Sequence, residues 1–176
     1  MKYRLRNELR LCRNTLSDDE VFFKSQKIVG NALPYIIKGK HIGVYMAFGK
    51  EVQTTELISY ILEVGSAYVP KIEKEDMDFY QIHKDTCYEM NAYQIQEPIA
   101  TKKILPQQLD IIFVPLVGFN KQKHRIGYGK GYYDRYLKKT NATTIGLAYE
   151  CQLCNEHFQD AYDIALDMII TEEKVY

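Results

Sequence analysis

The feature that most constrains the fold of this chain is an apolar run at residues 110–119, Asp-Ile-Ile-Phe-Val-Pro-Leu-Val-Gly-Phe. Its branched and aromatic side chains favour a strand that is buried on both faces. The run is also far shorter than the roughly 20 apolar residues that span a bilayer. Pro115 has no amide hydrogen to donate, so we expect the strand to bend or to reach a sheet edge there.

Helical and strand-like segments alternate through the rest of the chain. Residues 2–14 carry an apolar stripe at Leu5 and Leu9. Ser17-Asp-Asp-Glu20 has the form of a capping box, which begins a helix that ends before Pro34. Further helices are predicted at 54–64 and 132–139, and further strands at 41–48, 67–72, 77–82, 143–148 and 168–171.

This alternation predicts one α/β domain over residues 1–176. We expect three α/β/α layers around a central sheet that is largely parallel or mixed. Residues 83–108 are polar and interrupted by proline, and they are expected to form a mixed excursion from the sheet.

Charge and cysteine content limit the partners and the compartment. The 176 residues include 23 Lys and Arg and 23 Asp and Glu, so net charge favours neither nucleic acid nor a membrane. Because no apolar signal-peptide segment follows the basic N-terminus, we expect a cytoplasmic protein with reduced thiols. Cys151-Gln-Leu-Cys154 is interpreted as ordinary thiols, since no second pair completes a zinc site. A monomer is expected, because no heptad pattern is evident.

The segment that carries chemistry is a glycine-spaced loop between the buried strand and the helix at 132–139. Glycines at 127, 129 and 131 remove side chains where a backbone approaches a ligand or takes a positive φ angle. Arg125 and Lys130 add cations beside a helix N-terminus, which is typical of a polyphosphate site. The spacing fits neither the Walker loop nor GxGxxG. A simple tight glycine turn is the alternative.

Two carboxylates are candidate magnesium ligands. Asp134 follows the loop, and a metal ion there would offset repulsion between the carboxylate and a phosphate. Asp167 precedes the last predicted strand and is the candidate second ligand. Each has a structural alternative: Asp134 as an acid that stabilises a helix N-terminus, and Asp167 as a loop residue.

These residues resemble those of a known family. The segment 125–134, Arg-Ile-Gly-Tyr-Gly-Lys-Gly-Tyr-Tyr-Asp, closely resembles the signature of 5-formyltetrahydrofolate cyclo-ligase, also called 5,10-methenyltetrahydrofolate synthetase. The resemblance extends to residues 2–6, 113–119, 145–152 and 167–171, and so reaches nearly the whole chain. One departure is Ala165, where the family often has proline two residues before Asp167.

The resemblance implies an ATP site and a metal site. ATP is expected to contact the N-terminal element and the glycine loop, namely Lys2, Tyr3, Arg4, Leu5, Arg6, Arg125, Ile126, Gly127, Tyr128, Gly129, Lys130, Gly131, Tyr132 and Tyr133. Mg²⁺ is expected at Asp134 and Asp167. A solvated helix face is the alternative for the other basic residues of the first helix, Arg10 and Arg13.

The resemblance also implies a folate site and a catalytic set. The formyl substrate is expected at Met46, Glu51, Tyr128 and Tyr132, and the candidate catalytic residues are Lys130, Arg125 and Tyr132. A flat pterin suits aromatic and Met side chains, and a carboxylate accepts hydrogen bonds from its N–H groups. Core packing for Met46 and a surface acid for Glu51 are the alternatives.

The implied activity is an ATP- and Mg²⁺-dependent cyclisation of 5-formyltetrahydrofolate to 5,10-methenyltetrahydrofolate, with release of ADP and phosphate. Phosphorylation of the formyl oxygen makes it a good leaving group, and N10 then attacks the activated carbon, so no covalent protein nucleophile is needed. From the residues alone, two other classes remain open: an enzyme of sugar phosphates or CoA that uses the loop for a single phosphate, and a non-catalytic nucleotide-binding module.

Overall fold

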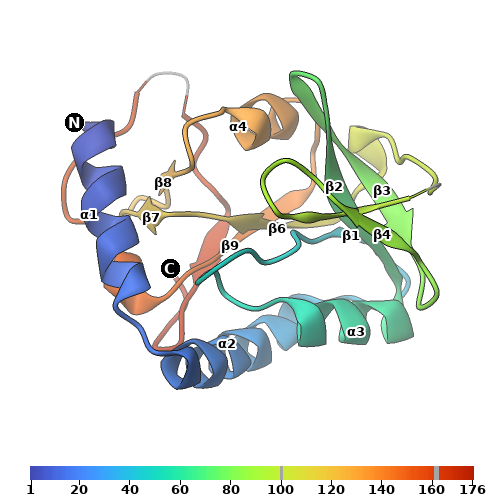
Figure 1. The fold of residues 1–176 in the computed structure, drawn as a ribbon, viewed down its shortest axis with the longest axis horizontal. Helices are drawn as coiled ribbons and strands as arrows, with labels where there is room; N and C mark the ends of the chain where they lie inside the picture. Colours follow the sequence, from blue (N-terminus) through green and yellow to red (C-terminus); the bar gives the residue numbers. More distant parts are fainter. Residues whose placement is uncertain (100, 161–162) are drawn as a thin grey trace.

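The structure, a computed structural model, describes residues 1–99, 101–160 and 163–176. Its central sheet has six strands in the order β10 (Met168–Ile170), β9 (Thr143–Leu147), β6 (Ile111–Pro115), β1 (His41–Gly43), β2 (Ser66–Glu73) and β3 (Asp76–Ile82). Neighbouring strands are parallel except β2 and β3, which form an antiparallel pair at one edge. The predicted α/β fold with a largely parallel, mixed sheet is therefore confirmed (Figure 1).

Helices cover both faces of the sheet. On one face lie α2 (Asp18–Ala32) and α3 (Thr55–Val64), and on the other lies α4 (Tyr132–Leu137) (Figure 1). The apolar stripe of α1 (Lys2–Asn14), formed by Leu5 and Leu9, packs on a separate small cluster that includes Val117 and Ile126. The remaining elements are η1 (Leu33–Tyr35), β4 (Tyr88–Met90), β5 (Gln96–Pro98), η2 (Pro106–Gln108), β7 (Gly118–Phe119), β8 (Arg125–Ile126) and η3 (Glu150–Gln152).

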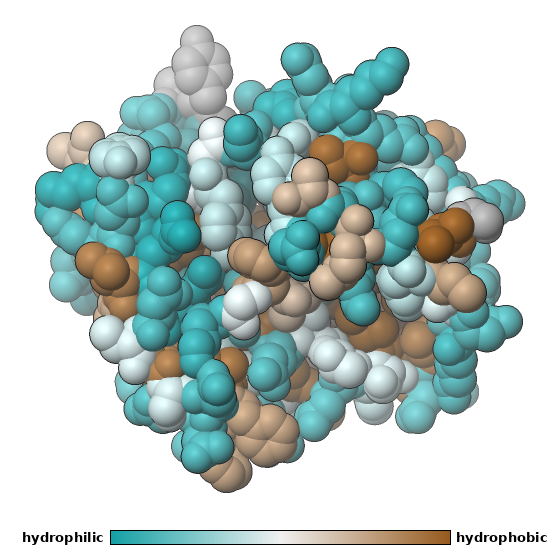
Figure 2. Space-filling model, in the orientation of Figure 1, coloured by the Kyte–Doolittle hydropathy of each residue, from teal (hydrophilic) through white to brown (hydrophobic). Residues whose placement is uncertain are grey.

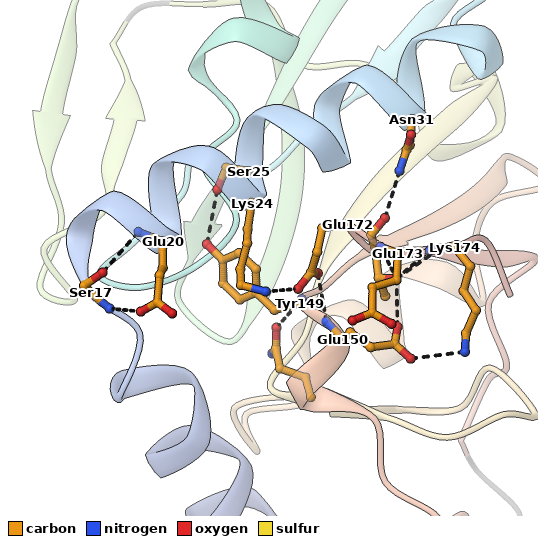
Figure 3. Close-up of polar contacts among 12 residues, drawn as sticks. Ser17, Glu20, Lys24, Ser25, Asn31, Tyr149, Glu150, Glu172, Glu173 and Lys174 are labelled. Carbon is orange, nitrogen blue, oxygen red and sulfur yellow. Dashed lines mark hydrogen bonds and ion pairs between the residues drawn. The ribbon is translucent and has the colours of Figure 1, made fainter.

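The second helix begins at the predicted capping box. The Ser17 hydroxyl accepts the Glu20 N–H at 3.2 Å, and the Glu20 carboxylate accepts the Ser17 N–H at 2.8 Å. Further along α2, the Ser25 and Tyr149 hydroxyls lie 3.2 Å apart, and Lys24 forms an ion pair with Glu172 (Figure 3). These contacts tie α2 to the segments that follow β9 and β10.

The apolar run 110–119 forms two strands rather than one. The strand β6 ends at Pro115, as its missing amide hydrogen predicted, and β7 begins at Gly118 in a separate two-stranded sheet with β8. The side-chain amide of Gln152 donates to the carbonyl oxygens of Leu116 and Val117 at 3.0 and 2.9 Å. This side chain replaces the lost ladder bonds and lets the chain leave the sheet beside α1.

The first strand is shorter than the predicted 41–48. It ends at Gly43, and the chain then continues as a loop that is buried at Val44 and Tyr45, exposed at 47–49, and leads to α3. The Thr54 hydroxyl donates to the Tyr45 carbonyl at 2.8 Å, and the Tyr45 hydroxyl donates to the Val52 carbonyl at 2.9 Å. These side-chain bonds hold the loop at the carboxyl end of β1, where it can line a site.

The polar segment 83–108, described except for residue 100, forms the expected excursion and includes the hairpin β4–β5 and η2. Glu97 is buried and accepts the Ile72 N–H at 3.0 Å and the Asn91 side-chain amide at 2.8 Å. One carboxylate therefore fixes both the turn of the hairpin and its position against β2.

The face in Figure 2 is mostly hydrophilic, and its hydrophobic residues form small separate groups. Exposed apolar residues of this scattered kind are normal for a folded chain. Within the described ranges, no helix has the length and apolar character needed to cross a membrane.

Candidate active site

One cavity of about 540 Å³ lies where the loop after β1 meets the end of β6 and the glycine-spaced loop. Ligands of open α/β sheets bind at the carboxyl ends of the strands, and this cavity follows that rule. Its walls combine a basic side and an apolar side. They are formed by Lys2, Arg6, Tyr45, Met46, Phe48, Glu51, Pro70, Ile72, Met77, Asn91, Tyr93, Ile95, Glu97, Pro115, Arg125, Ile126, Gly127, Tyr128, Gly129, Lys130, Gly131, Tyr132, Tyr133, Asp134 and Asp163.

The glycine-spaced loop lines this cavity along its whole length from Arg125 to Asp134. Gly129 and Gly131 have φ angles of +94° and +72°, which other residues rarely adopt. A side chain at Gly129 would also meet the Arg6 guanidinium, whose Nε donates to the Gly127 carbonyl at 2.8 Å. The loop is thus open on its cavity side and carries an arginine of α1 against its backbone.

Arg125 is buried beneath the loop. Its guanidinium donates to the Asp134 carboxylate at 2.7 Å and lies 5.6 Å from the centre of the Tyr133 ring. Burial lowers the pKa of Arg125, and the negative charge of Asp134 offsets part of that shift. A guanidinium remains charged under these conditions, so Arg125 supplies a fixed positive charge and also orients Asp134.

The N-terminal element contributes two of its five expected contacts to the cavity. Lys2 and Arg6 line the cavity, in agreement with their spacing on one helix face. Leu5 is buried in the small apolar cluster, and Tyr3 is 75% exposed outside the cavity. Arg4 forms exposed ion pairs with Glu8 and Glu156. The helix therefore turns the three residues between Lys2 and Arg6 away from the site.

The two expected metal ligands lie in different places. Asp134 lines the cavity, whereas Asp167 lies at the amino end of β10 and does not. One Asp167 oxygen accepts the Thr144 N–H and hydroxyl at 2.7 and 2.8 Å, so its carboxylate joins β10 to β9. Parallel strands present their amino ends at the opposite edge from this cavity. The structure thus does not bring Asp167 to Asp134.

Another carboxylate, Asp163, takes the position that we assigned to Asp167. It lines the cavity and accepts a hydrogen bond from Lys2 Nζ at 2.5 Å. Asp134 and Asp163 line the same cavity as Arg125, and the charges of both carboxylates offset part of the lowering of the Arg125 pKa that burial causes. Among the described residues there is no cluster of three His, Cys, Asp or Glu side chains suited to a metal. The pair Asp134 and Asp163 is nevertheless suited to Mg²⁺, because this ion is usually bound by one or two carboxylates and completes its coordination shell with phosphate oxygens and water.

Two of the expected folate contacts, Met46 and Glu51, lie on the apolar side of the cavity. Met46 is half-buried, and Glu51 is only 6% exposed. Glu51 accepts the Tyr128 hydroxyl at 2.5 Å and the Phe48 N–H at 2.9 Å. Burial raises the pKa of Glu51, and these hydrogen bonds together with the charge of Arg13 lower it in part. Glu51 is therefore a buried acceptor at the cavity wall rather than a surface acid.

Lys130 and Tyr132 lie at the open side of the cavity. Lys130 is exposed on the loop, and the Tyr132 ring lies 5.3 Å below the Arg135 guanidinium. Tyr128 has an exposed ring, but its hydroxyl points inward to Glu51. All the candidate catalytic residues and all the expected substrate contacts thus line one cavity.

The sequence reasoning missed most of the wall that faces the loop. This wall comes from β2, β3 and the hairpin turn, and consists of Pro70, Ile72, Met77, Asn91, Tyr93, Ile95 and Glu97. Residues of these types are common in any core. The sequence offered one signal: Tyr93 and Ile95 are large apolar residues within a polar segment, which is unusual for a linker.

Comparison with known proteins agrees with this geometry. The sequence profile of the 5-formyltetrahydrofolate cyclo-ligase family matches residues 1–172. The chain is 31% identical to 5-formyltetrahydrofolate cyclo-ligase of Haemophilus influenzae, over 94% of each chain, and 33% identical to that of Mycoplasma genitalium, over 96% of each.

Solved structures show the same fold. The 5,10-methenyltetrahydrofolate synthetase of Aquifex aeolicus has a TM-score of 0.90 with 34% identity, over 99% of this chain and 91% of that one. The synthetase of Mycoplasma pneumoniae has a TM-score of 0.81 with 30% identity, over 97% and 98% of the two chains.

The fold and the cavity define an α/β enzyme with a glycine-loop site at the carboxyl ends of its strands. The chain belongs to the 5-formyltetrahydrofolate cyclo-ligase family. The resemblance and the enzyme class predicted from the sequence are therefore confirmed.

Proposed function

We propose that this chain converts 5-formyltetrahydrofolate to 5,10-methenyltetrahydrofolate in a reaction that consumes ATP and requires Mg²⁺. The relatives bear the names of this activity. The observation that carries the proposal is that a single cavity joins the glycine-spaced loop, with its cations, to a buried carboxylate on an apolar wall.

The basic side of the cavity suits a triphosphate. Lys2, Arg6 and Lys130 converge on it from α1 and from the loop. The loop backbone and these side chains would hold the phosphates by charge-assisted hydrogen bonds. The buried Arg125 adds a positive charge that does not move during the reaction, which is the form of electrostatic stabilisation that accelerates phosphoryl transfer.

Asp134 and Asp163 are the residues that would hold Mg²⁺, with the remaining ligands supplied by phosphate oxygens and water. When bound, the ion would neutralise charge on the transferred phosphoryl group. Asp134 keeps its place through Arg125, and Asp163 keeps its place through Lys2. The two carboxylates are therefore oriented before any ligand enters.

The apolar side suits the folate. Glu51 would accept hydrogen bonds from the pterin amino and ring N–H groups, while Met46 and Tyr93 offer faces for a flat ring. Tyr128 and Tyr132 also line the cavity and would lie beside the formyl group. The formyl oxygen would be phosphorylated there, and N10 would then attack the formyl carbon as phosphate leaves. The chain supplies positioning and charge, not a covalent nucleophile.

The test is an absorbance assay for the methenyl product with the purified chain. We expect product to form from 5-formyltetrahydrofolate only when ATP and Mg²⁺ are both present, with one ADP released per product. ATP binding without folate-dependent ADP release would instead indicate a nucleotide-binding module. We further propose that the chain acts as a monomer in the cytoplasm, and gel filtration tests the oligomeric state.

A further inference from the structure

The buried cation Arg13 stands behind the folate side of the cavity, although the sequence reasoning left it on a solvated helix face. Arg13 is in the last turn of α1 and is 4% exposed. It is not a lining residue of the cavity. Arg10, one turn earlier on the same helix, is exposed as expected. Burying a guanidinium is costly unless the group has a partner or a task.

Arg13 and Glu51 both form hydrogen bonds with the Tyr128 hydroxyl. Its Nη1 donates to the Tyr128 hydroxyl at 3.0 Å, and its guanidinium carbon lies 5.7 Å from the centre of the Tyr128 ring. The Tyr128 hydroxyl lies 2.5 Å from Glu51 Oε1. The three side chains form a chain of contacts from α1 through the glycine-spaced loop to the loop after β1.

The chemistry of the donors fixes which group donates each of these hydrogen bonds. A guanidinium only donates, so the Tyr128 oxygen must accept from Arg13, and the single Tyr128 proton is left for Glu51. The other Glu51 oxygen accepts the Phe48 N–H. Because both oxygens accept, these hydrogen bonds favour the carboxylate form of Glu51 and offset part of the rise in its pKa that burial causes, while lone pairs are left for a ligand.

The backbone of Glu51 is also held, independently of Arg13. The Tyr149 hydroxyl donates to the Glu51 carbonyl at 3.1 Å and lies beside Ser25 of α2, whose hydroxyl accepts the Gln53 N–H at 3.0 Å. Figure 3 shows Ser25 and Tyr149 pointing toward each other. Since the backbone has these supports, Arg13 is left to control the Glu51 side chain.

Arg13 is not placed for stability alone. Its Nε is buried and has no hydrogen-bond partner among the residues that the structure describes. A buried donor without a partner lowers stability. A residue that only packed against Tyr128 would serve better as an apolar side chain of similar volume.

From this geometry we infer that Arg13 is a positioning residue for the folate. It directs the Tyr128 proton to Glu51 and so keeps the Glu51 carboxylate ready to accept the N–H groups of the pterin. This inference rests on the proposed function, because it names the folate as the ligand of Glu51. It assigns Arg13 no contact with ATP or with the reacting atoms.

The experiment is a double-mutant cycle with Arg13→Leu and Tyr128→Phe, read as KM for each substrate and as kcat. Arg13→Leu is expected to raise KM for 5-formyltetrahydrofolate about tenfold, as for loss of one charge-assisted hydrogen bond. KM for ATP should stay within about twofold. Because Arg13 acts through Tyr128, adding Arg13→Leu to Tyr128→Phe should change KM for the folate by less than about twofold.

Two further variants complete the design. Arg10→Leu removes an exposed charge from the same helix and should leave all constants unchanged. Arg13→Lys keeps a donor at this position and should recover part of the folate affinity. If Arg13→Leu does not fold, the cycle is run with Arg13→Lys. The inference would be overturned if the rises in folate KM from Arg13→Leu and Tyr128→Phe multiplied in the double variant. It would also be overturned if Arg13→Leu raised the KM values for the folate and for ATP equally.

The inference and the proposed function fail in different ways. If the wild type forms methenyl product and Arg13→Leu behaves like it, only the role of Arg13 is wrong. If the wild type forms no product, the proposed function is wrong. The cycle can then be repeated on calorimetric binding of 5-formyltetrahydrofolate, and a wild type that does not bind it overturns both.

Discussion

The two sides of the cavity are built in different ways. The basic side comes largely from one continuous segment, 125–134, with Lys2 and Arg6 of α1. The apolar side is assembled from the loop after β1, the hairpin β4–β5 and parts of β2 and β3, over residues 45–97. Its one carboxylate that we assign to the substrate, Glu51, is buried, whereas Lys130 on the basic side is exposed.

This difference separates two tasks. An open, positively charged loop can attract and hold phosphates before the ligand is fully enclosed. A buried acceptor on an apolar wall instead selects among ligands. A ligand without matching N–H groups would leave Glu51 without a hydrogen-bond partner and would therefore bind more weakly. We therefore expect substitutions on the basic side to affect ATP and turnover, and those on the apolar side to affect the folate.

The largest expected effect is on the basic side. Lys130→Ala should lower kcat/KM for ATP by about 100- to 1,000-fold, because it removes a cation from the charge developed in phosphoryl transfer. Steady-state kinetics measure this, and unchanged thermal unfolding would show that the fold is intact. Lys121→Ala, an exposed charge in the turn after β7, is the matched control. A rise confined to KM for the folate would contradict the division between the two sides.

The next effect is on the apolar side. Glu51→Gln should raise KM for 5-formyltetrahydrofolate by roughly 10- to 100-fold, since hydrogen bonds to a charged group contribute about 1.5–3 kcal/mol. KM for ATP should change by less than about twofold. Glu63→Gln, an exposed acid at the end of α3, is the control. Equal changes in both KM values would show that the two sides act as one unit.

A smaller effect tests the two acids near the chain end. Asp163→Asn should raise the Mg²⁺ concentration for half-maximal activity by about tenfold, while Asp167→Asn should leave it unchanged. Asp167→Asn should instead lower the unfolding temperature, because Asp167 holds Thr144 at the start of β9. Magnesium titrations and thermal unfolding give the two readouts. The reverse pattern would restore Asp167 as the metal ligand.

The smallest effect concerns stability and pH. Burial raises the pKa of Glu51 above its ordinary value, so the folded chain keeps a proton that the unfolded chain releases. The stability that Glu51 contributes is present at low pH and is lost as pH rises through the folded-state pKa. Relative to the wild type, Glu51→Gln should therefore gain in unfolding temperature as pH rises through the folded-state pKa of Glu51, and thermal unfolding at a series of pH values measures this. A relative loss would indicate that Glu51 is stabilised as an anion.

Much of the fold could be predicted because its signals are local. The capping box at Ser17 and the apolar run that forms β6 need no information from distant residues. The ends of β1 and β6 could not be placed in the same way. They depend on hydrogen bonds from Thr54 to Tyr45 and from Gln152 to Leu116, which exist only after folding.

The site likewise has parts that local sequence signals predicted and parts that depend on contacts made only after folding. Glycine spacing and neighbouring cations predicted the loop that lines the cavity, because its signal lies in ten consecutive residues, 125–134. Asp163 and Asp167 are four residues apart and chemically identical, and contacts made only after folding separate them: Asp163 binds Lys2 at the cavity, whereas Asp167 binds Thr144 at the amino end of β10. Sequence alone could not distinguish the buried Arg13 from the exposed Arg10, because the burial of Arg13 depends on the distant loop that carries Tyr128.

The docking of α1 has a consequence for how the enzyme is made. This helix is made before the surfaces that receive it, because the partners of Leu5, Lys2 and Arg13 are residues beyond 116. At about 5–20 residues per second, the helix waits on the order of 10 s for its partners. During that interval the apolar stripe of α1 has no surface to pack against. The cavity is therefore complete only after Asp163, which lines it, has been made.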